Sequence, residues 1–267
     1  MNARLKASRY ALVLLATVSL AAADLKVDLS KERVGQPPTA FEPMVGTWTI
    51  VEDGGEKAVM VDGRPWVASK DTPTKLLVES ARKLYGTNNE ELMDNAKQFA
   101  YYPVAVLKSV AKFSNGSISM KFKTVAGDAD RCSGILFNVK PNGDWLALRY
   151  NDTEHNVILW EFHNGIRRPL IRPRDGVLLT APGDREKWHE LKLEVDGANI
   201  VGSLDGTRVL TYTLGSAPPP GRNNAPPSPD LLPENNPVLR APIDGKVGLW
   251  SKTDSTSYFK DYVVNAR

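Results

Sequence analysis

Two residue types suited to acid–base chemistry stand two positions apart in an apolar segment. Glu161 and His163 lie in N-V-I-L-W-E-F-H, and residues two apart on a strand share a side at roughly 6.5 Å. A carboxylate and an imidazole at that separation could act as acid and base, although structural or surface pairs are the commoner explanation. The chain has no G-x-S-x-G elbow and no P-loop. Glu161 and His163 are therefore the candidate catalytic residues.

Metal chemistry finds less support. His155, His163 and His189 are the three histidines, and the first two bracket one segment at roughly 26 Å if that segment is a strand. They cannot share an ion, so we predict no zinc site. A structural calcium ion would suit the fold expected below, but no Asp-rich loop with a set spacing supports one. We predict no metal site and no cofactor.

Aromatic, cationic and carboxylate side chains gather in two other segments. In W-L-A-L-R-Y-N, Trp145 and Arg149 share one side of a strand. In V-G-L-W-S-K-T-D, Trp250, Lys252 and Asp254 also share one side if the strand stays regular. Aromatic faces pack on sugar C–H groups while polar side chains bind the hydroxyls. The alternative is that Trp250 belongs to the core and the two charges form an ion pair. The predicted substrate-binding residues are Arg149, Asn156, Trp250, Lys252 and Asp254.

The elements that must position these residues are strands. Residues 116–123 and 188–195 alternate between apolar and polar, which is typical of half-buried strands. Residues 134–139, 145–150 and 156–163 are apolar on both sides, which suits the middle of a sandwich. Further strands are expected at 46–51, 246–250 and 257–264, and Asn-Gly and Asp-Gly pairs supply turns. This pattern predicts an all-β fold, a two-sheet antiparallel jelly-roll sandwich.

Two segments interrupt the strand pattern. Residues 72–99 predict a helical hairpin packed on the sandwich edge, with Thr72 as cap, Pro73 in the first turn and Gly86 between the helices. Residues 215–244 form a long loop with nine prolines, which excludes regular strand pairing. A disordered surface insertion is the favoured interpretation. A wall of a binding groove and a docking strip for a protein partner are the alternatives.

The first residues predict export. Arg4, Lys6 and Arg9 precede an apolar run at 10–20 and three alanines, the pattern of a signal peptide over 1–23 followed by a single domain over 24–267. The apolar run is shorter than a membrane span, so we expect no stable membrane insertion after cleavage. The location is then periplasmic or extracellular.

Charge and cysteine content narrow the partners. Without the leader the chain holds 31 basic and 31 acidic residues, so nothing attracts nucleic acid at long range and a neutral partner is favoured. Cys132 is the single cysteine, which rules out an intramolecular disulfide and is expected to be a buried, inert thiol.

Several segments carry a family resemblance. L-R-Y-N-D-T-E-H-N-V-I-L-W-E-F-H-N-G-I-R-R, K-W-H-E-L-K-L-E-V-D-G and G-K-V-G-L-W-S-K-T-D-S-T-S-Y-F-K-D-Y-V-V resemble exported bacterial concanavalin-A-like and laminin-G-like jelly rolls related to the 3-keto-disaccharide hydrolase (DUF1080-type) domain. The resemblance implies a concanavalin-A-like lectin/glucanase fold and a link to carbohydrate. Tyr150-Asn151 and Phe259-Lys260-Asp261 depart from the motif, and the second departure loses a carboxylate, which weakens the transfer of hydrolase activity.

The leading functional hypothesis is an exported carbohydrate-recognition protein that binds a neutral glycan or glycoside. A first alternative is a sugar hydrolase or lyase of the 3-keto-disaccharide hydrolase type, with Glu161 and His163, or Asp254, as acid and base. A second is a non-catalytic scaffold that uses the Pro-rich loop. A deep cleft holding two titratable groups would favour catalysis, and a shallow aromatic groove would favour binding.

Overall fold

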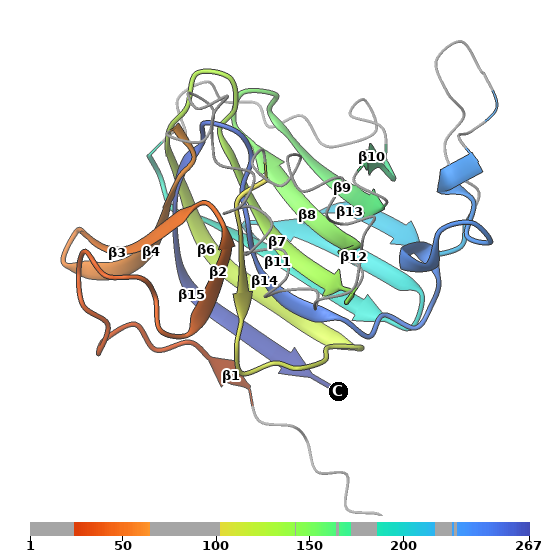
Figure 1. The fold of residues 1–267 in the computed structure, drawn as a ribbon, viewed down its shortest axis with the longest axis horizontal. Helices are drawn as coiled ribbons and strands as arrows, with labels where there is room; N and C mark the ends of the chain where they lie inside the picture. The colour runs from red at the N-terminus through yellow and green to blue at the C-terminus, as the bar shows by residue number, and fades with distance from the viewer. Residues whose placement is uncertain are drawn as a thin grey trace, which may run out of the picture.

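The fold is a two-layer β-sandwich (Figure 1). The computed structural model describes residues 24–64, 102–141, 143–163, 166–171, 186–216, 226 and 229–267. The expected signal peptide (1–23) and helical hairpin (72–99) lie outside these residues. Within them, no helix is both long enough and apolar enough to span a bilayer. The predicted antiparallel jelly-roll sandwich is confirmed.

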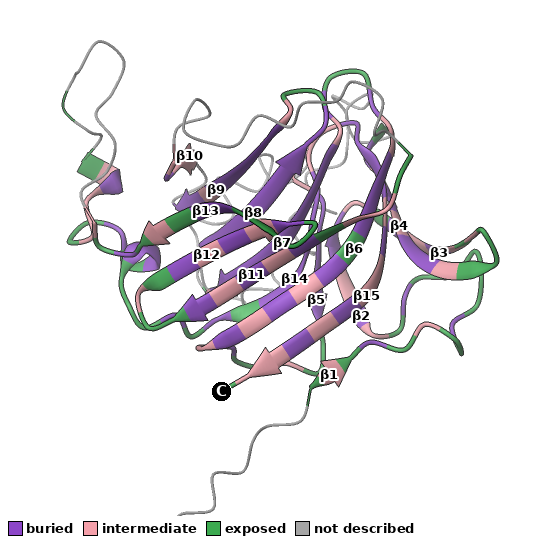
Figure 2. Cartoon of the chain, turned by 180° about the vertical axis from the view of Figure 1, so that it is seen from behind, coloured by how far each residue is buried: buried purple, intermediate pink, exposed green. Residues whose placement is uncertain are grey.

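The larger sheet carries the alternating strands. In β6, Ile118, Met120 and Phe122 are buried while Lys121 is exposed, and Figure 2 shows the same alternation of burial along β11, β12 and β15. The eight strands are β13 (Thr207–Thr213), β12 (Asn199–Leu204), β11 (His189–Asp196), β6 (Gly116–Ala126), β15 (Thr256–Ala266), β4 (Glu56–Asp62) and β3 (Thr47–Asp53) in spatial order, with β1 (Leu25–Lys26) paired to β15.

The smaller sheet carries the strands that are apolar on both sides. Every residue of three central strands is buried, apart from Trp160, as the continuous purple of β8 in Figure 2 shows. The seven strands in spatial order are β10 (Ile166–Pro169), β9 (Asn156–His163), β8 (Trp145–Asn151), β7 (Cys132–Val139), β14 (Lys246–Trp250), β5 (Val104–Leu107) and β2 (Phe41–Val45).

The main core lies between the sheets. Leu146, Leu148 and Tyr150 of β8 point into it, and the ring of Tyr150 lies 4.7 Å from that of Phe122 on the opposing sheet. The intervening residues of β8 therefore point the other way, because successive side chains on a strand alternate between its faces. This confirms that Trp145 and Arg149 share a side opposite Leu146, Leu148 and Tyr150, and it defines an outer face of the seven-stranded sheet.

Part of the Pro-rich segment is built into the core. Residues 229–244 contain two short 3₁₀ helices, η4 (Pro229–Leu231) and η5 (Pro237–Leu239), and bury four apolar side chains. Asn138 of β7 donates to the carbonyl oxygen of Val238 at 3.2 Å. The expectation of a disordered insertion is wrong for this stretch, because apolar side chains between the prolines hold it on the sandwich. The buried side chains are Leu231, Val238, Leu239 and Ile243.

Candidate functional site

The strand register brings three predicted binding residues to the outer face. Arg149 lies opposite Gly134 of β7, and Trp250 of β14 lies opposite the same glycine. Asn156 pairs with Asn151, two positions along β8 from Arg149. Residues opposite each other in antiparallel strands point to the same face. Arg149, Trp250 and Asn156 therefore share one sheet face, and all three are buried, with Trp250 in a hydrophobic cluster. Their role in binding a sugar stays a prediction.

Lys252 and Asp254 lie beyond the end of β14 and are not part of its strand alternation. Strand β14 ends at Trp250, and Thr253 has a positive φ of 45°, so the expected alternation from Trp250 to Asp254 is wrong. Asp254 instead accepts hydrogen bonds from the backbone N–H groups of residues 128, 129 and 130 at 2.6–3.0 Å. Lys252 forms an ion pair with Asp130 at 2.7 Å. Both side chains hold the loop that leads into β7.

The outer face carries a second, largely buried cluster that is rich in aromatic side chains. The indole of Trp250 stacks on Tyr102 at 6.1 Å and meets Trp145 edge-on at 6.1 Å. Trp145 in turn stacks on Phe162 at 4.9 Å. We call this set, with the neighbouring Trp160 and two arginines, the outer-face cluster: Tyr102, Trp145, Arg149, Trp160, Phe162, Arg167 and Trp250.

The two arginines of the cluster have different environments. Arg149 is 0 % exposed, donates to Asn156 Oδ1 at 2.7 Å and pairs with Glu154 at 2.8 Å. Arg167 is half-buried, and its guanidinium carbon lies 3.8 Å from the ring centre of Trp160 and 5.0 Å from that of Tyr102. Arg149 is thus held by polar groups and Arg167 by rings.

Several N–H donors of the cluster are buried without an acceptor. Burial of a donor without a hydrogen bond costs about 1–3 kcal/mol, and such groups are rare in folded proteins. Six side-chain polar atoms are in this state among the described residues, and five of them belong to the cluster. The five are Trp145 Nε1, Trp160 Nε1, Trp250 Nε1, Arg149 Nε and Arg167 Nη1. The five cluster atoms that lack a hydrogen-bond partner are all N–H donors.

Exposure separates an inner from an outer part of the cluster. Trp250 and Arg149 are 0 % exposed and Trp145 is also buried. Tyr102, Trp160 and Arg167 keep part of their surface in solvent. The side chains of the predicted platform, Arg149, Asn156 and Trp250, are therefore buried, and the partly exposed side chains of the cluster are Tyr102, Trp160 and Arg167. The unpaired atoms Trp160 Nε1 and Arg167 Nη1 are themselves buried.

Glu161 lies on the opposite side of β9, facing the other sheet. Its side chain is 0 % exposed; Oε1 accepts from Arg168 at 3.1 Å and Oε2 from Asn236 at 3.1 Å. Burial raises the pKa of Glu161 to about 7, against the lowering effect of these hydrogen bonds. Arg168 also pairs with Asp230, so Glu161 anchors the 3₁₀ segment to the sheet edge.

His163, the other candidate catalytic residue, is 6 % exposed. Its Nδ1 lies 2.7 Å from Asp144 Oδ2, and this hydrogen bond raises the pKa of His163. The pair Glu161 and His163 shares a strand side, but each member is bound to an internal partner. The catalytic role of the pair stays a prediction.

Within the described ranges, neither the single cysteine nor the potential metal ligands form a candidate site. Cys132 is buried, as expected, and burial raises the pKa of its thiol to about 12, which makes the thiolate inaccessible at neutral pH. Across the described part of the chain, no group of three or more His, Cys, Asp or Glu side chains could hold a metal ion.

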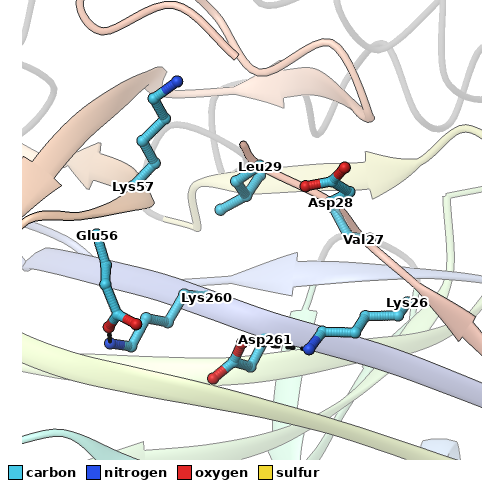
Figure 3. A pocket seen from close by; sticks show the side chains of 8 residues that line it. All are labelled: Lys26, Val27, Asp28, Leu29, Glu56, Lys57, Lys260 and Asp261. Atoms are coloured by element: carbon cyan, nitrogen blue, oxygen red, sulfur yellow. Dashed lines mark hydrogen bonds and ion pairs between the residues drawn. The ribbon is translucent and has the colours of Figure 1, made fainter. Parts of the chain in front are cut away.

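A pocket of about 430 Å³ opens on the other sheet, between β1, β4 and β15 (Figure 3). Its charged groups are occupied: Lys260 pairs with Glu56, Lys26 lies 3.9 Å from Asp261, and Lys57 donates to two backbone carbonyl oxygens. None of the predicted site residues lines it. The lining residues are Lys26, Val27, Asp28, Leu29, Glu56, Lys57, Lys260 and Asp261.

The sequence analysis missed Trp160, Arg167 and Tyr102. Trp160 could have been found, because it stands four residues after Asn156 and strand alternation puts both on one side. Arg167 could have been found by continuing the hairpin register, which pairs it with Phe162. Tyr102 follows the long segment expected to be helical, and no local pattern connects it to the sheet.

Comparisons with known proteins give structural likenesses. No protein-family model and no curated protein matches the chain. A Bacillus subtilis carbohydrate-binding module, CBM66, is 14% identical with a TM-score of 0.49, over 84% of this chain and 94% of that one. The apo Crh5 transglycosylase is 14% identical with a TM-score of 0.47, over 92% and 85%. A Bacillus subtilis protein of unknown function with a galectin-like fold is 13% identical with a TM-score of 0.44, over 85% and 88%.

The resemblance to the 3-keto-disaccharide hydrolase group stays a prediction.

Proposed function

We propose that this chain is a carbohydrate-binding jelly roll that takes a saccharide on the outer face of its seven-stranded sheet, after export to the periplasm or beyond the cell. The observation that carries the proposal is the set of five buried donors without acceptors on that face. A saccharide offers many hydroxyl and ring oxygens, which can accept these hydrogen bonds.

The rings of the cluster supply the second requirement. The C–H faces of a sugar pack on aromatic rings, and Trp160 and Tyr102 are the partly exposed rings of the cluster. The buried rings of Trp145 and Trp250 fix the position of Tyr102 by edge and stacking contacts, and Trp160 is contacted by the guanidinium groups of Arg149 and Arg167. A rigid aromatic floor reduces the entropy lost on binding. The overall charge balance favours a neutral glycan at long range.

Trp160→Ala tests the proposal in a glycan-array experiment with the purified mature chain. We expect the wild-type chain to retain a saccharide and the variant to lose most of that binding, because both a ring and a donor are removed. Trp188→Ala is the matched control: Trp188 is also half-buried and contacts lysine side chains, but it lies next to β11 on the other sheet. Equal binding by both variants would exclude the outer face as the site.

The hydrolase alternative has one observation in its favour. The pKa of Glu161 is raised to about 7, a value suited to a general acid at neutral pH, but the side chain is fully buried. An assay on ordinary and 3-keto disaccharides separates the two functions. Turnover that disappears in Glu161→Gln would establish the enzyme, and binding without turnover would favour recognition alone.

A further inference from the structure

We infer that the saccharide bound on the outer face carries a carboxylate, as a uronic acid does, and that Arg167 recognises it. This inference rests on the proposed function and names the ligand class for the same face.

Arg167 has no counterion among the residues that the structure describes. Arg149 pairs with Glu154, and Arg168 pairs with Glu161 and Asp230. Among the described residues, Arg167 has no ion pair and no hydrogen bond; its contacts are the rings of Trp160 and Tyr102. Half-buried guanidinium groups usually have carboxylate or carbonyl partners, because removing the charge from water is unfavourable.

The surroundings of Arg167 increase this cost. Burial lowers the pKa of Arg167, and the positive charge of Arg149 on the same sheet face lowers it further. Contact with the rings of Trp160 and Tyr102 offsets part of the desolvation, since aromatic faces attract cations. The rings accept no hydrogen bond from Arg167 Nη1, which has no acceptor within the described part of the chain, so a bound carboxylate would stabilise the group.

The geometry of the stack selects a carboxylate over a hydroxyl. With its carbon 3.8 Å from the ring centre of Trp160, the guanidinium group is held over the indole. Its N–H groups lie in the guanidinium plane and form a fork that matches the two oxygens of a carboxylate. A single sugar hydroxyl fills only one branch of such a fork.

The zero net charge expected for the mature chain does not oppose this assignment. Net charge governs attraction at distances beyond about 8–10 Å, where salt screens it in any case. Selection at contact depends on the groups within hydrogen-bond reach. At Arg167 those groups are donors and rings, which favours an anionic ligand.

The test compares uronic-acid oligosaccharides with their neutral forms. Short oligomers of galacturonate, glucuronate and mannuronate are titrated into the mature chain, each beside its carboxyl-reduced counterpart, with calorimetry and tryptophan fluorescence as readouts. We expect one acid oligomer to bind at least about tenfold more tightly than its reduced form, the range of a charge-assisted hydrogen bond. Added salt should reduce this difference.

Two variants assign the effect to Arg167. Arg167→Gln should remove the preference for the acid, so that acid and reduced oligomers bind with similar affinity, and Arg167→Lys should retain part of it because the charge remains without the fork. Arg208→Gln is the control for net charge, since Arg208 is exposed on β13 of the other sheet. Thermal unfolding of each variant checks that the fold is intact.

The outcomes separate this inference from the proposed function. Equal binding of acid and reduced oligomers overturns the carboxylate assignment and leaves the sugar-binding face in place. Failure of every oligomer, acid and reduced, contradicts the proposed function itself. An acid preference that survives in Arg167→Gln places the carboxylate at another residue and overturns the role of Arg167.

Discussion

Replacement of Glu161 by glutamine should change how stability depends on pH. The carboxylate is fully buried between the sheets and is hydrogen-bonded by Arg168 and Asn236. Burial raises the pKa of Glu161 to about 7, against 4.5 for a free glutamate. The folded chain therefore holds this proton more tightly than the unfolded chain does.

The sign and size of the effect follow from linkage. Because the folded state binds the extra proton, the contribution of Glu161 to stability is fully present below pH 4.5 and is lost as the pH rises through about 7. Each pKa unit corresponds to about 1.4 kcal/mol, so the free energy of unfolding should fall by about 3 kcal/mol over this interval. Glutamine has no such ionisation, and Glu161→Gln should lack this fall.

His163 adds a separate decrease at higher pH. The hydrogen bond with Asp144 raises the pKa of His163 above 6.5, so its contribution is present below 6.5 and is lost as the pH rises through the folded value. Glu161→Gln should therefore keep a decrease above pH 6.5 and lose the one that begins near pH 4.5. The double variant Glu161→Gln/His163→Gln should lose both.

Urea unfolding at half-unit steps from pH 4.5 to 9 measures these curves. Glu190→Gln serves as the control, because Glu190 is exposed on β11, and its curve should match the wild type. A variant Glu161→Gln that loses stability between pH 4.5 and 7 as steeply as the wild-type chain would refute the reasoning. Burial would then be too shallow to raise the pKa, or Arg168 would keep the carboxylate charged.

Three further predictions concern the outer face and its supporting loop. Trp160→Phe should leave the free energy of unfolding within about 1 kcal/mol of wild type, since it removes an unpaired donor and a small volume, but should weaken saccharide binding in calorimetry. Gly134→Ala should destabilise by about 1–3 kcal/mol in urea unfolding, because a Cβ there would lie 2.9 Å from the Leu148 carbonyl oxygen and 3.0 Å from the Trp250 ring. Asp254→Asn should destabilise by about 1.5–3 kcal/mol, because three backbone N–H groups lose a charged acceptor. Burial raises the pKa of Asp254, but these bonds outweigh it and lower the pKa below 3.8, so acid unfolding below pH 3.8 should be less steep in Asp254→Asn.

Local alternation was enough to predict most of the strands. Ile118, Met120 and Phe122 stand at period two and face the core of β6, because a half-buried strand must separate its faces. Trp145 and Arg149 were placed on one side of β8 by the same reasoning. The strand order could not be predicted this way: β14 lies between β7 and β5, which are far from it in the sequence.

The candidate site shows where alternation stops being informative. It failed for Asp254, because the strand ends at Trp250 and the chain turns at Thr253 with a positive φ. It also could not report exposure: a tryptophan on the outer face of a sheet and one in the core give the same pattern. Trp250 lies on the outer face and is nevertheless fully buried in a hydrophobic cluster, where its ring contacts Tyr102 and Trp145.

The buried N–H donors without acceptors on the outer face lower the stability of the free chain. Burial of each donor without an acceptor costs about 1–3 kcal/mol, and five such donors lie in the outer-face cluster. If this face served packing alone, we would expect side chains without N–H donors, such as phenylalanine and leucine, to fill the same space. Side chains of this kind make up most of the core between the sheets. The concentration of unpaired indole and guanidinium N–H groups on one side of one sheet is instead expected where a ligand supplies the acceptors. The Trp160→Phe comparison separates the two cases, because a packing role predicts lost stability with unchanged binding, and a binding role predicts the reverse.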